Sequence, residues 1–225
     1  MPYLSKPRLK ICGITNLDDA RLVAALGADY LGFIFYPGSP RYVEPERVRE
    51  ILAWIHGPEP VGVFLGSDPE EILQIVAATG IRTVQLHGLE SPEQIRRLRD
   101  RGLRIIKTLH AAHDASIEHL RALAEPYREL VDYLLLDTRS GDLWGGTGEC
   151  FDWRLARAMA SEFPLFLAGG IGPDNLLLAA RTVRPYGLDV NSRLESEPGR
   201  KDPARVQALF SAWAELEAPR RGEAQ

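Results

Sequence analysis

Eight short apolar runs alternate along this chain with eight amphipathic segments, and this alternation constrains the fold more than any other feature. The apolar runs lie at residues 9–14, 30–35, 61–65, 83–87, 104–109, 133–138, 165–168 and 187–191. Several of them, such as YLGFIF and YLLLD, are continuously apolar, which is typical of strands buried on both faces of a parallel sheet. Strict alternation of strands and helices also indicates a parallel sheet. Eight such units predict an α/β fold of the closed (β/α)₈ type, the TIM barrel.

The amphipathic segments carry the start and stop signals of helices. They lie at residues 16–26, 44–55, 68–79, 91–101, 115–124, 152–161, 174–182 and 202–216. The third opens with SDPEE and ends before Gly80, and the fourth opens with SPEQ and ends before Gly102. The alternative is an open, doubly wound sheet, but such a sheet needs an edge strand and no run resembles one. With no linker-like stretch, residues 1–225 are expected to form one barrel domain, with 216–225 as a frayed tail.

Composition excludes several classes of partner. The chain has 225 residues, of which 45% are hydrophobic and 26% charged, and its net charge of -4 provides no basic footprint for nucleic acid. No apolar run approaches the ~20 residues that span a bilayer, and the N-terminus lacks the layout of a signal peptide. Two cysteines, Cys12 and Cys150, cannot form a disulfide framework and suit a reducing compartment. We therefore expect a cytoplasmic protein that binds neither nucleic acid nor membranes.

In a (β/α)₈ barrel the active site lies where the strands end, so polar residues at those positions are the candidates. Cys12 ends the first apolar run and is followed by Gly13. It is either a small core residue or a base or nucleophile whose pKa its surroundings depress. Asp137 ends the fully apolar run YLLL, where a carboxylate is costly unless it lies at a rim or is paired. It is either a turn residue or a general acid whose pKa is raised by desolvation.

Glycine-rich stretches follow the sixth and seventh strands. In AGGIGPDN, Gly169 and Gly170 allow the backbone to approach a phosphate group just before a helix N-terminus. The loops after strands 7 and 8 often bind phosphate in such barrels, and Asn191 and Ser192 follow strand 8. Together they predict a phosphorylated small molecule as ligand. Gly145 and Gly146 lie in a loop that either contacts an anion or substrate or is merely a long connection.

Four further side chains are candidates for the same site. Arg41, in the loop YPGSPRYV, either binds a carboxylate group through two parallel hydrogen bonds or is an exposed loop arginine. Gln85 and His87, in QLHG, are expected to contact substrate, although His87 could instead fill the upper layer of the barrel. Lys107 is either a Schiff-base lysine or a source of charge. The remaining histidines at positions 56, 110, 113 and 119 show no metal-ligand spacing with any cysteine or acid, so no metal is expected.

As a set, these motifs resemble the phosphoribosylanthranilate isomerase family of tryptophan biosynthesis. The matching stretches run in order from Lys10 to Asp202: KICGIT, GADYLGFIFYPGSPRYV, VGVF, VQLHG, LLLDT with GGTGECFDW, LAGGI, and LDVNSRLES followed by PGRKD. The resemblance implies a (β/α)₈ barrel that catalyses an Amadori rearrangement without a cofactor. By position, Cys12 matches the family's general base and Asp137 its general acid.

The resemblance also implies the binding residues. Arg41 matches the arginine that holds the anthranilate carboxylate, and Gly169, Gly170 and Ser192 match the phosphate-binding loops. One departure is Arg193, which stands where the family commonly has glycine after two serines. It either adds a charge to the phosphate site or points to solvent.

The sequence leaves three other functions open. The first is a histidine-pathway or bifunctional isomerase of the same fold, although that pathway's enzyme is expected to use aspartates as both acid and base. The second is an aldolase built on Lys107, and the third is a barrel that binds a phosphorylated ligand without turnover. The sequence leaves both a monomer and a homodimer possible.

Overall fold

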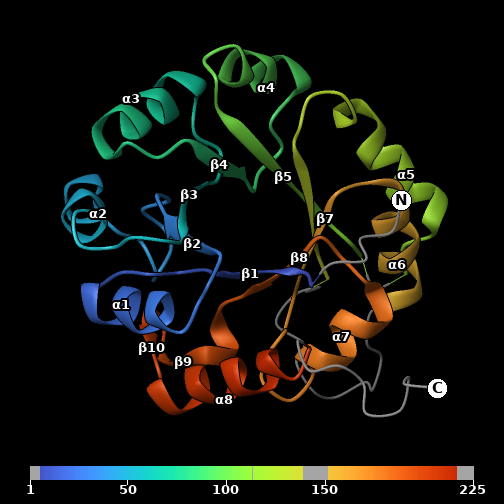
Figure 1. Cartoon of the computed structure of the whole chain (residues 1–225). Helices are drawn as coiled ribbons and strands as arrows, with labels where there is room; N and C mark the ends of the chain where they lie inside the picture. The colour runs from blue at the N-terminus through green and yellow to red at the C-terminus, as the bar shows by residue number, and fades with distance from the viewer. Residues whose placement is uncertain (1–5, 113, 139–151, 217–225) are drawn as a thin grey trace.

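A closed barrel of eight parallel strands forms the centre of the molecule in the computed structural model, which describes residues 6–112, 114–138 and 152–216 (Figure 1). The strands are β1 Arg8–Ile11, β2 Tyr30–Ile34, β3 Glu59–Phe64, β4 Thr83–Leu86, β5 Arg104–His110, β6 Tyr133–Asp137, β7 Leu165–Ala168 and β8 Gly187–Val190. Pairing of β1 with both β2 and β8 closes the ring. The predicted TIM barrel is therefore confirmed, and the open-sheet alternative is wrong.

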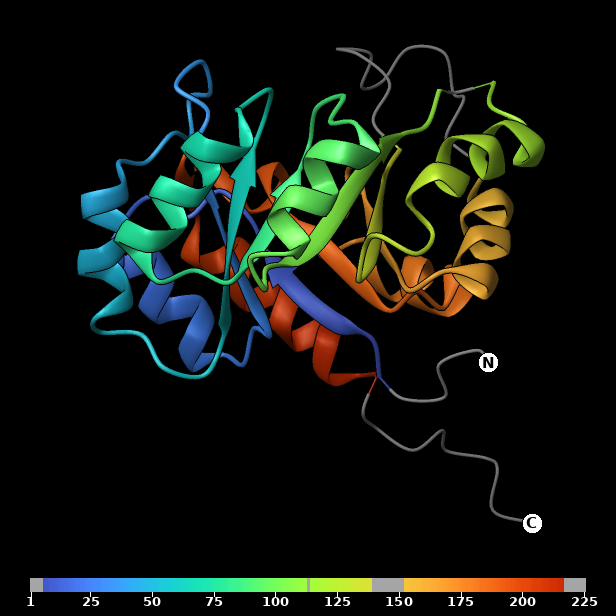
Figure 2. The same cartoon turned by 90° about the horizontal axis from the view of Figure 1, so that it is seen from above.

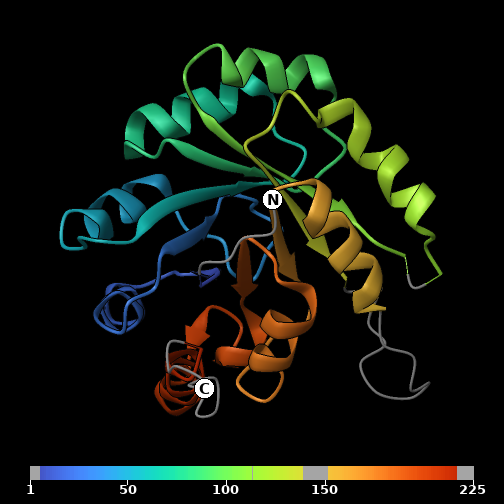
Figure 3. The same ribbon diagram turned by 45° about the vertical axis from the view of Figure 1, so that its right-hand side comes forward.

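Helices surround the barrel, and Figures 1 and 3 show them only on the outside of the strand ring. They are α1 Leu17–Ala25, α2 Pro45–Leu52, α3 Pro69–Thr79, α4 Pro92–Arg99, α5 Ile117–Ala124, α6 Trp153–Glu162, α7 Leu176–Val183 and α8 Pro203–Ala214. Half of them begin with proline, whose missing N–H costs nothing in the first turn of a helix. Each of the eight predicted helical segments overlaps one of these helices, and α6 and α7 each extend one residue beyond the predicted end.

The differences from the predicted bounds lie mainly at the carboxyl ends of the strands. Strand β1 ends at Ile11 rather than Ile14, because Gly13 adopts a left-handed backbone with a φ of +74° and turns the chain out of the sheet. The sequence also did not predict four short elements, two of them 3₁₀ turns and two forming an antiparallel hairpin. They are η1 Glu125–Tyr127, η2 Ser192–Leu194, β9 Glu195–Glu197 and β10 Arg200–Lys201. These elements are too short to produce a periodic apolar pattern.

Alternation along the strands divides the core into two parts. Outward-facing residues such as Leu9 and Ile11 join the large cluster between strands and helices. Inside the ring, an apolar cluster includes Tyr30 and Phe166, near the amino ends of their strands. Figure 2 shows the amino-terminal end of β1 beside the end of α8, where the Lys6 ammonium lies 4.8 Å from the ring centre of Trp213.

Candidate active site

A cavity of about 240 Å³ opens at the carboxyl ends of the barrel strands. It brings together nearly all of the candidate residues that the sequence suggested. Its lining includes Cys12, Arg41, Gln85, His87, Asp137, Gly169, Gly170, Asn191 and Ser192. Gly145 and Gly146, and likewise Cys150, lie outside the described residues. The site is therefore assembled from the ends of strands that are far apart in the sequence.

Cys12 directly follows β1, and glycines leave room for it and for the neighbouring Asn191. Its N–H donates to the carbonyl oxygen of Val190 on β8, at 2.9 Å. A Cβ atom at Gly32 on β2 would lie 2.8 Å from the Cys12 sulfur and 3.1 Å from Lys10 Nζ. The absence of this Cβ atom leaves the space beside β2 that the two side chains occupy. A Cβ atom at Gly13 would lie 2.6 Å from Asn191 Oδ1. Glycine at position 32 thus leaves room for the thiol, and glycine at position 13 leaves room for Asn191.

A buried ion pair lies directly beneath the thiol. Both carboxylate oxygens of Asp189 on β8 lie 2.9 Å from Lys10 Nζ on β1, and the Lys10 side chain is fully buried. Burial alone would lower the pKa of Lys10, but the charge of Asp189 and its hydrogen bonds raise that pKa above its usual value. Lys10 is therefore a fixed positive charge. Sequence reasoning missed this pair, whose only signal was one charged residue within each of the apolar strands LKI and LDV.

The surroundings of Cys12 act on its thiol in opposite directions. Burial raises the pKa of Cys12, and the charge of Lys10, which is within hydrogen-bonding reach of the sulfur, lowers it. The net pKa lies above the usual value of a thiol. The thiolate is thus the minor form at neutral pH, and Lys10 is the main group that favours it.

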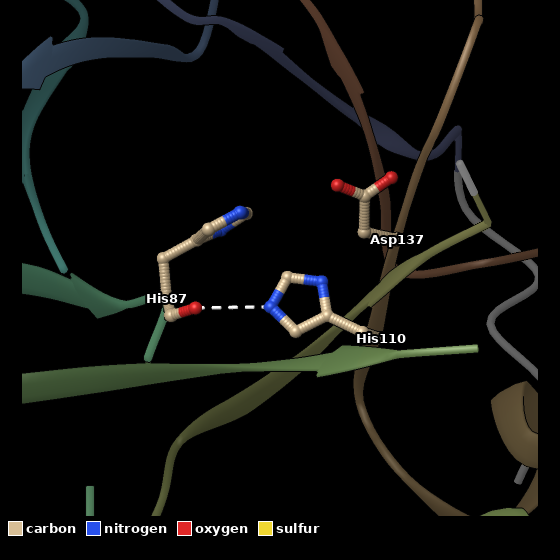
Figure 4. Close-up of side chains that lie close together, drawn as sticks. All are labelled: His87, His110 and Asp137. Carbon is tan, nitrogen blue, oxygen red and sulfur yellow. Dashed lines mark hydrogen bonds between the residues drawn. The ribbon is translucent and has the colours of Figure 1, made fainter. Parts of the chain in front are cut away.

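Asp137, the last residue of β6, lies at the rim of the cavity beside two histidines (Figure 4). His87 Nδ1 lies 3.2 Å from Thr108 Oγ1, and His110 Nε2 donates to the carbonyl oxygen of His87 at 2.9 Å. Burial and the neighbouring His110 lower the pKa of His87 to about 4, so the His87 ring is neutral at physiological pH. His87 lines the cavity rather than filling the core of the barrel.

Arg41 is held by a carboxylate of this chain. Its Nε and Nη2 atoms both donate to Glu195, the first residue of β9, with the Nη2 contact at 2.6 Å. Lys201 Nζ lies 3.1 Å from the same carboxylate and 3.0 Å from Asn191 Oδ1. Burial would raise the pKa of Glu195, but these two cations lower it. Arg41 is therefore a fixed, half-buried part of the cavity wall rather than an exposed loop arginine.

The loops after β7 and β8 present backbone groups to the cavity. Gly169 and Gly170 have φ angles of +94° and +65°, and within the described residues their N–H groups donate no hydrogen bond. Arg193 pairs with Asp174 in the loop before α7 and lies over Gly172, where a Cβ atom would be 2.9 Å from its side chain. Arg193 therefore links the two loops through this ion pair.

Lys107 lies outside the cavity. Its Nζ atom contacts Glu90 Oε2 at 3.0 Å and the carbonyl oxygens of Gly88 and Thr108 at 2.7 and 3.0 Å. The amine is buried between the sheet and the loop that leads to α4. An amine surrounded by oxygens and remote from the cavity cannot attack a carbonyl substrate, so this geometry argues against the Schiff-base hypothesis.

Comparison with known proteins identifies the family. The family model described as N-(5'-phosphoribosyl)anthranilate (PRA) isomerase matches residues 9–212. The chain belongs to this family. A phosphoribosylanthranilate isomerase of Rubrobacter xylanophilus is 41% identical over 206 residues, which cover 91% of this chain and 98% of that protein. The sequence-based family resemblance is thereby confirmed.

Solved structures of phosphoribosylanthranilate isomerases have the same fold. The enzyme of Thermotoga maritima is 37% identical, with a TM-score of 0.83 over 93% of this chain and 100% of that one. Another, with a TM-score of 0.81, 36% identity and the same coverage, is described as a complex with reduced 1-(o-carboxyphenylamino)-1-deoxyribulose 5-phosphate. None of the helices within 6–112, 114–138 and 152–216 combines the length and apolar character that crossing a bilayer requires.

Proposed function

We propose that Cys12 is the general base and Asp137 the general acid with which this chain catalyses its family's reaction. That reaction is the Amadori rearrangement of N-(5-phosphoribosyl)anthranilate to 1-(2-carboxyphenylamino)-1-deoxyribulose 5-phosphate in tryptophan biosynthesis. The observation that carries the assignment is that one cavity at the carboxyl ends of the strands is lined by both residues, from β1 and β6, together with the glycine-rich loop after β7.

The two side chains suit the two proton transfers of this isomerisation. Asp137 in its acid form protonates the furanose ring oxygen, the bond from C1 to that oxygen breaks, and the nitrogen lone pair forms a protonated Schiff base at C1. The Cys12 thiolate then removes the proton from C2, which produces an enolamine and a neutral thiol. Tautomerisation of the enolamine places a proton on C1 and the ketone at C2. Each proton transfer of this kind contributes typically ~10²–10⁴-fold to the rate.

The ion pair beneath Cys12 assists the second step. Lys10 holds a positive charge beside the sulfur, and Asp189 fixes the position of that charge. A preorganised charge favours the thiolate without reorganising during the reaction. Lys10 acts through the thiol and is therefore a positioning and activating residue.

The two ends of the substrate are bound by different groups of the cavity wall. The N–H groups of Gly169 and Gly170, with Ser192, bind the phosphate. Arg41 binds the anthranilate carboxylate through Nη1, while Glu195 engages its Nε and Nη2 atoms and holds the guanidinium at the cavity wall. Fixing both ends orients C1 and C2 between acid and base.

The middle of the substrate meets amide and imidazole groups. Gln85 Oε1 is buried and has no hydrogen-bond partner among the described residues, so it is available to accept a bond from a sugar hydroxyl. Asn191 and His87 line the same cavity. Gly145 and Gly146 are proposed, on the sequence alone, to contact the bound substrate.

A fluorescence assay tests the acid and base assignments. Substrate is generated in situ, and the loss of its fluorescence is followed for the wild type, Cys12→Ala and Asp137→Asn. We expect each variant to lose at least about 10²-fold in kcat. Asp100→Asn is the matched control, since Asp100 is exposed at the end of α4. Turnover that survives Cys12→Ala would require another base, and a wild type without turnover would refute the function.

We propose in addition that the whole chain is one domain that works in the cytoplasm without a cofactor. Strands drawn from Arg8 to Val190 enter one closed sheet, and both chemical steps are proton transfers that side chains can perform. The tail expected to fray lies, beyond Leu216, outside the described residues. Size-exclusion chromatography with light scattering distinguishes the monomer from the homodimer.

A further inference from the structure

We propose that His87, His110 and Asp137 form a binding site for a divalent transition-metal ion, of which Zn²⁺ is the expected occupant, and that this ion inhibits the isomerase. The inhibition rests on the proposed role of Asp137 as general acid. The binding site itself rests only on the geometry of the three side chains.

The barrel brings these residues together from three consecutive strands. His87 follows β4, His110 ends β5 and Asp137 ends β6, with His110 and Asp137 directly paired in the sheet. One ligand atom of each residue lies within 4.8 Å of those of the other two. Two ligands of a tetrahedral zinc ion at 2.0–2.1 Å lie about 3.4 Å apart. Small side-chain rotations therefore suffice to close the site around an ion.

A hydrogen bond already sets the protonation pattern that a metal requires at His110. His110 Nε2 lies 2.9 Å from the His87 carbonyl oxygen, which can only accept, so the proton of a neutral His110 ring is on Nε2. The lone pair is then on Nδ1, which Figure 4 shows on the side of the ring toward Asp137. Metal-binding histidines commonly donate their second N–H to a carbonyl oxygen in this way.

His87 contacts two side chains through Nδ1, which lies 3.2 Å from Thr108 Oγ1 and 3.5 Å from Gln85 Nε2. Binding of an ion through Nε2 requires Nδ1 to donate to the Thr108 hydroxyl, which can accept this hydrogen bond. The two imidazole rings meet edge to face with their centres 4.7 Å apart. Two neutral imidazoles and one carboxylate form a ligand set that zinc uses in enzymes, with a fourth position left for water or substrate.

Occupation of this site would block the proposed chemistry. A carboxylate coordinated to Zn²⁺ does not carry the proton that the furanose oxygen must receive. The ion would also lie at the rim of the cavity that Cys12, Gln85 and Arg41 line. Zn²⁺ is therefore expected to inhibit turnover, and removal of the ion by a chelator is expected to restore it.

Cobalt(II) is the probe for the binding site, because its spectrum reports ligand type. The full-length protein is stripped with EDTA, dialysed and titrated with Co²⁺. We expect visible absorption that saturates at one ion per chain, without the near-ultraviolet charge-transfer band of a thiolate ligand. A thiolate band that disappears in Cys12→Ala would show that the metal binds the cysteine and would overturn the proposal.

Variants of His110 provide the decisive comparison. His110→Phe retains a ring against His87 but has no lone pair, and His110→Ala removes the ring. Both should weaken Co²⁺ binding at least about tenfold, the loss that even outer-sphere partners of a metal cause. His119→Ala is the matched control, because His119 is exposed on α5. Unchanged binding in both His110 variants, with the fold verified by circular dichroism, would overturn the site.

Inhibition is measured separately from binding. Zn²⁺ should abolish turnover of the wild type and of His119→Ala, whereas His110→Phe should need at least about tenfold more Zn²⁺. Binding without inhibition would overturn the inhibitory role and the assignment of Asp137 as acid, but not the metal site. Inhibition without the Co²⁺ signal would overturn the metal site and leave the proposed function intact.

Discussion

At the scale of single residues, the reactivity of Cys12 depends on a balance between burial and the neighbouring charges, of which Lys10 has the largest effect. Burial disfavours the thiolate, and the ammonium of Lys10 favours it. Asp189 acts in two ways, because its charge raises the pKa of Cys12 and it also keeps Lys10 protonated and in place. Cys12 alone transfers the proton, but Lys10 and Asp189 control how readily its thiol ionises.

This balance predicts a change in the thiol of Cys12 when Lys10 is removed. Lys10→Met should raise the pKa of Cys12 further above its usual value, because the group that lowers it is lost. The double variant Lys10→Met/Asp189→Asn should also raise the pKa of Cys12, because Lys10 lowers that pKa more than Asp189 raises it, and this variant leaves no unpaired buried carboxylate. In the wild type, alkylation of Cys12 by iodoacetamide should accelerate as pH rises above neutrality, since only the thiolate reacts.

The alkylation rate is measured against pH in a Cys150→Ser background, so that one thiol is followed. Both Lys10 variants should react more slowly than the parent at every pH below the raised pKa. Equal rates in the parent and the double variant would show that Lys10 does not control the thiol.

At the scale of elements, the connection from β4 to α4 is held from below by a buried ion pair. Lys107 on β5 binds Glu90 and the carbonyl oxygen of Gly88 in this connection, and the carbonyl oxygen of Leu86 at the end of β4. The connection also carries His87, so the ion pair fixes one wall of the cavity.

The connection from β4 ends at the capping box of α4. In this box the side chains of Ser91 and Gln94 each form a hydrogen bond to the backbone N–H of the other residue.

Breaking the ion pair of Lys107 and Glu90 should destabilise the protein. Glu90→Gln leaves the ammonium of Lys107, 3% exposed, without a counter-charge, and should lower the unfolding free energy by about 3–5 kcal/mol. Lys107→Met/Glu90→Gln should recover part of this loss, because an apolar side chain needs no partner. Urea unfolding measures both. A double variant less stable than Glu90→Gln would mean that Lys107 stabilises the loop through its carbonyl contacts rather than through Glu90.

Elements whose signals are local could be predicted from the sequence. The start of α4 is encoded in four consecutive residues, and Cys12 and Asp137 stand at strand ends where a barrel puts its site. The pair of Lys10 and Asp189 could not be predicted, because its partners are 179 positions apart and meet only when β1 closes against β8. His87 and His110 likewise show no metal-ligand spacing, since neighbouring strands rather than one helix bring them together.

At the scale of the whole molecule, the interior of the barrel has two ends with different chemistry. Toward the amino ends of the strands, Phe166 meets Tyr30, Tyr133 and Tyr186 edge to face, with ring centres 5.2 to 5.5 Å apart. Toward the carboxyl ends, the interior is polar, and all of the proposed catalytic groups lie there. Barrels of this type generally separate stability from catalysis in this way.

This separation predicts that stability can be reduced without loss of catalysis. Phe166→Ala removes a fully buried ring and should lower the unfolding free energy by about 3–5 kcal/mol, and Phe166→Leu should cost less. Because Phe166 does not line the cavity, kcat per folded molecule should stay within about twofold of the wild type, a change of less than ~0.5 kcal/mol in the barrier. Unfolding in urea gives the first quantity, and turnover at a temperature where each variant is folded gives the second. If kcat falls in proportion to stability, then the aromatic cluster and the site act as one unit, and the two ends of this barrel are not independent.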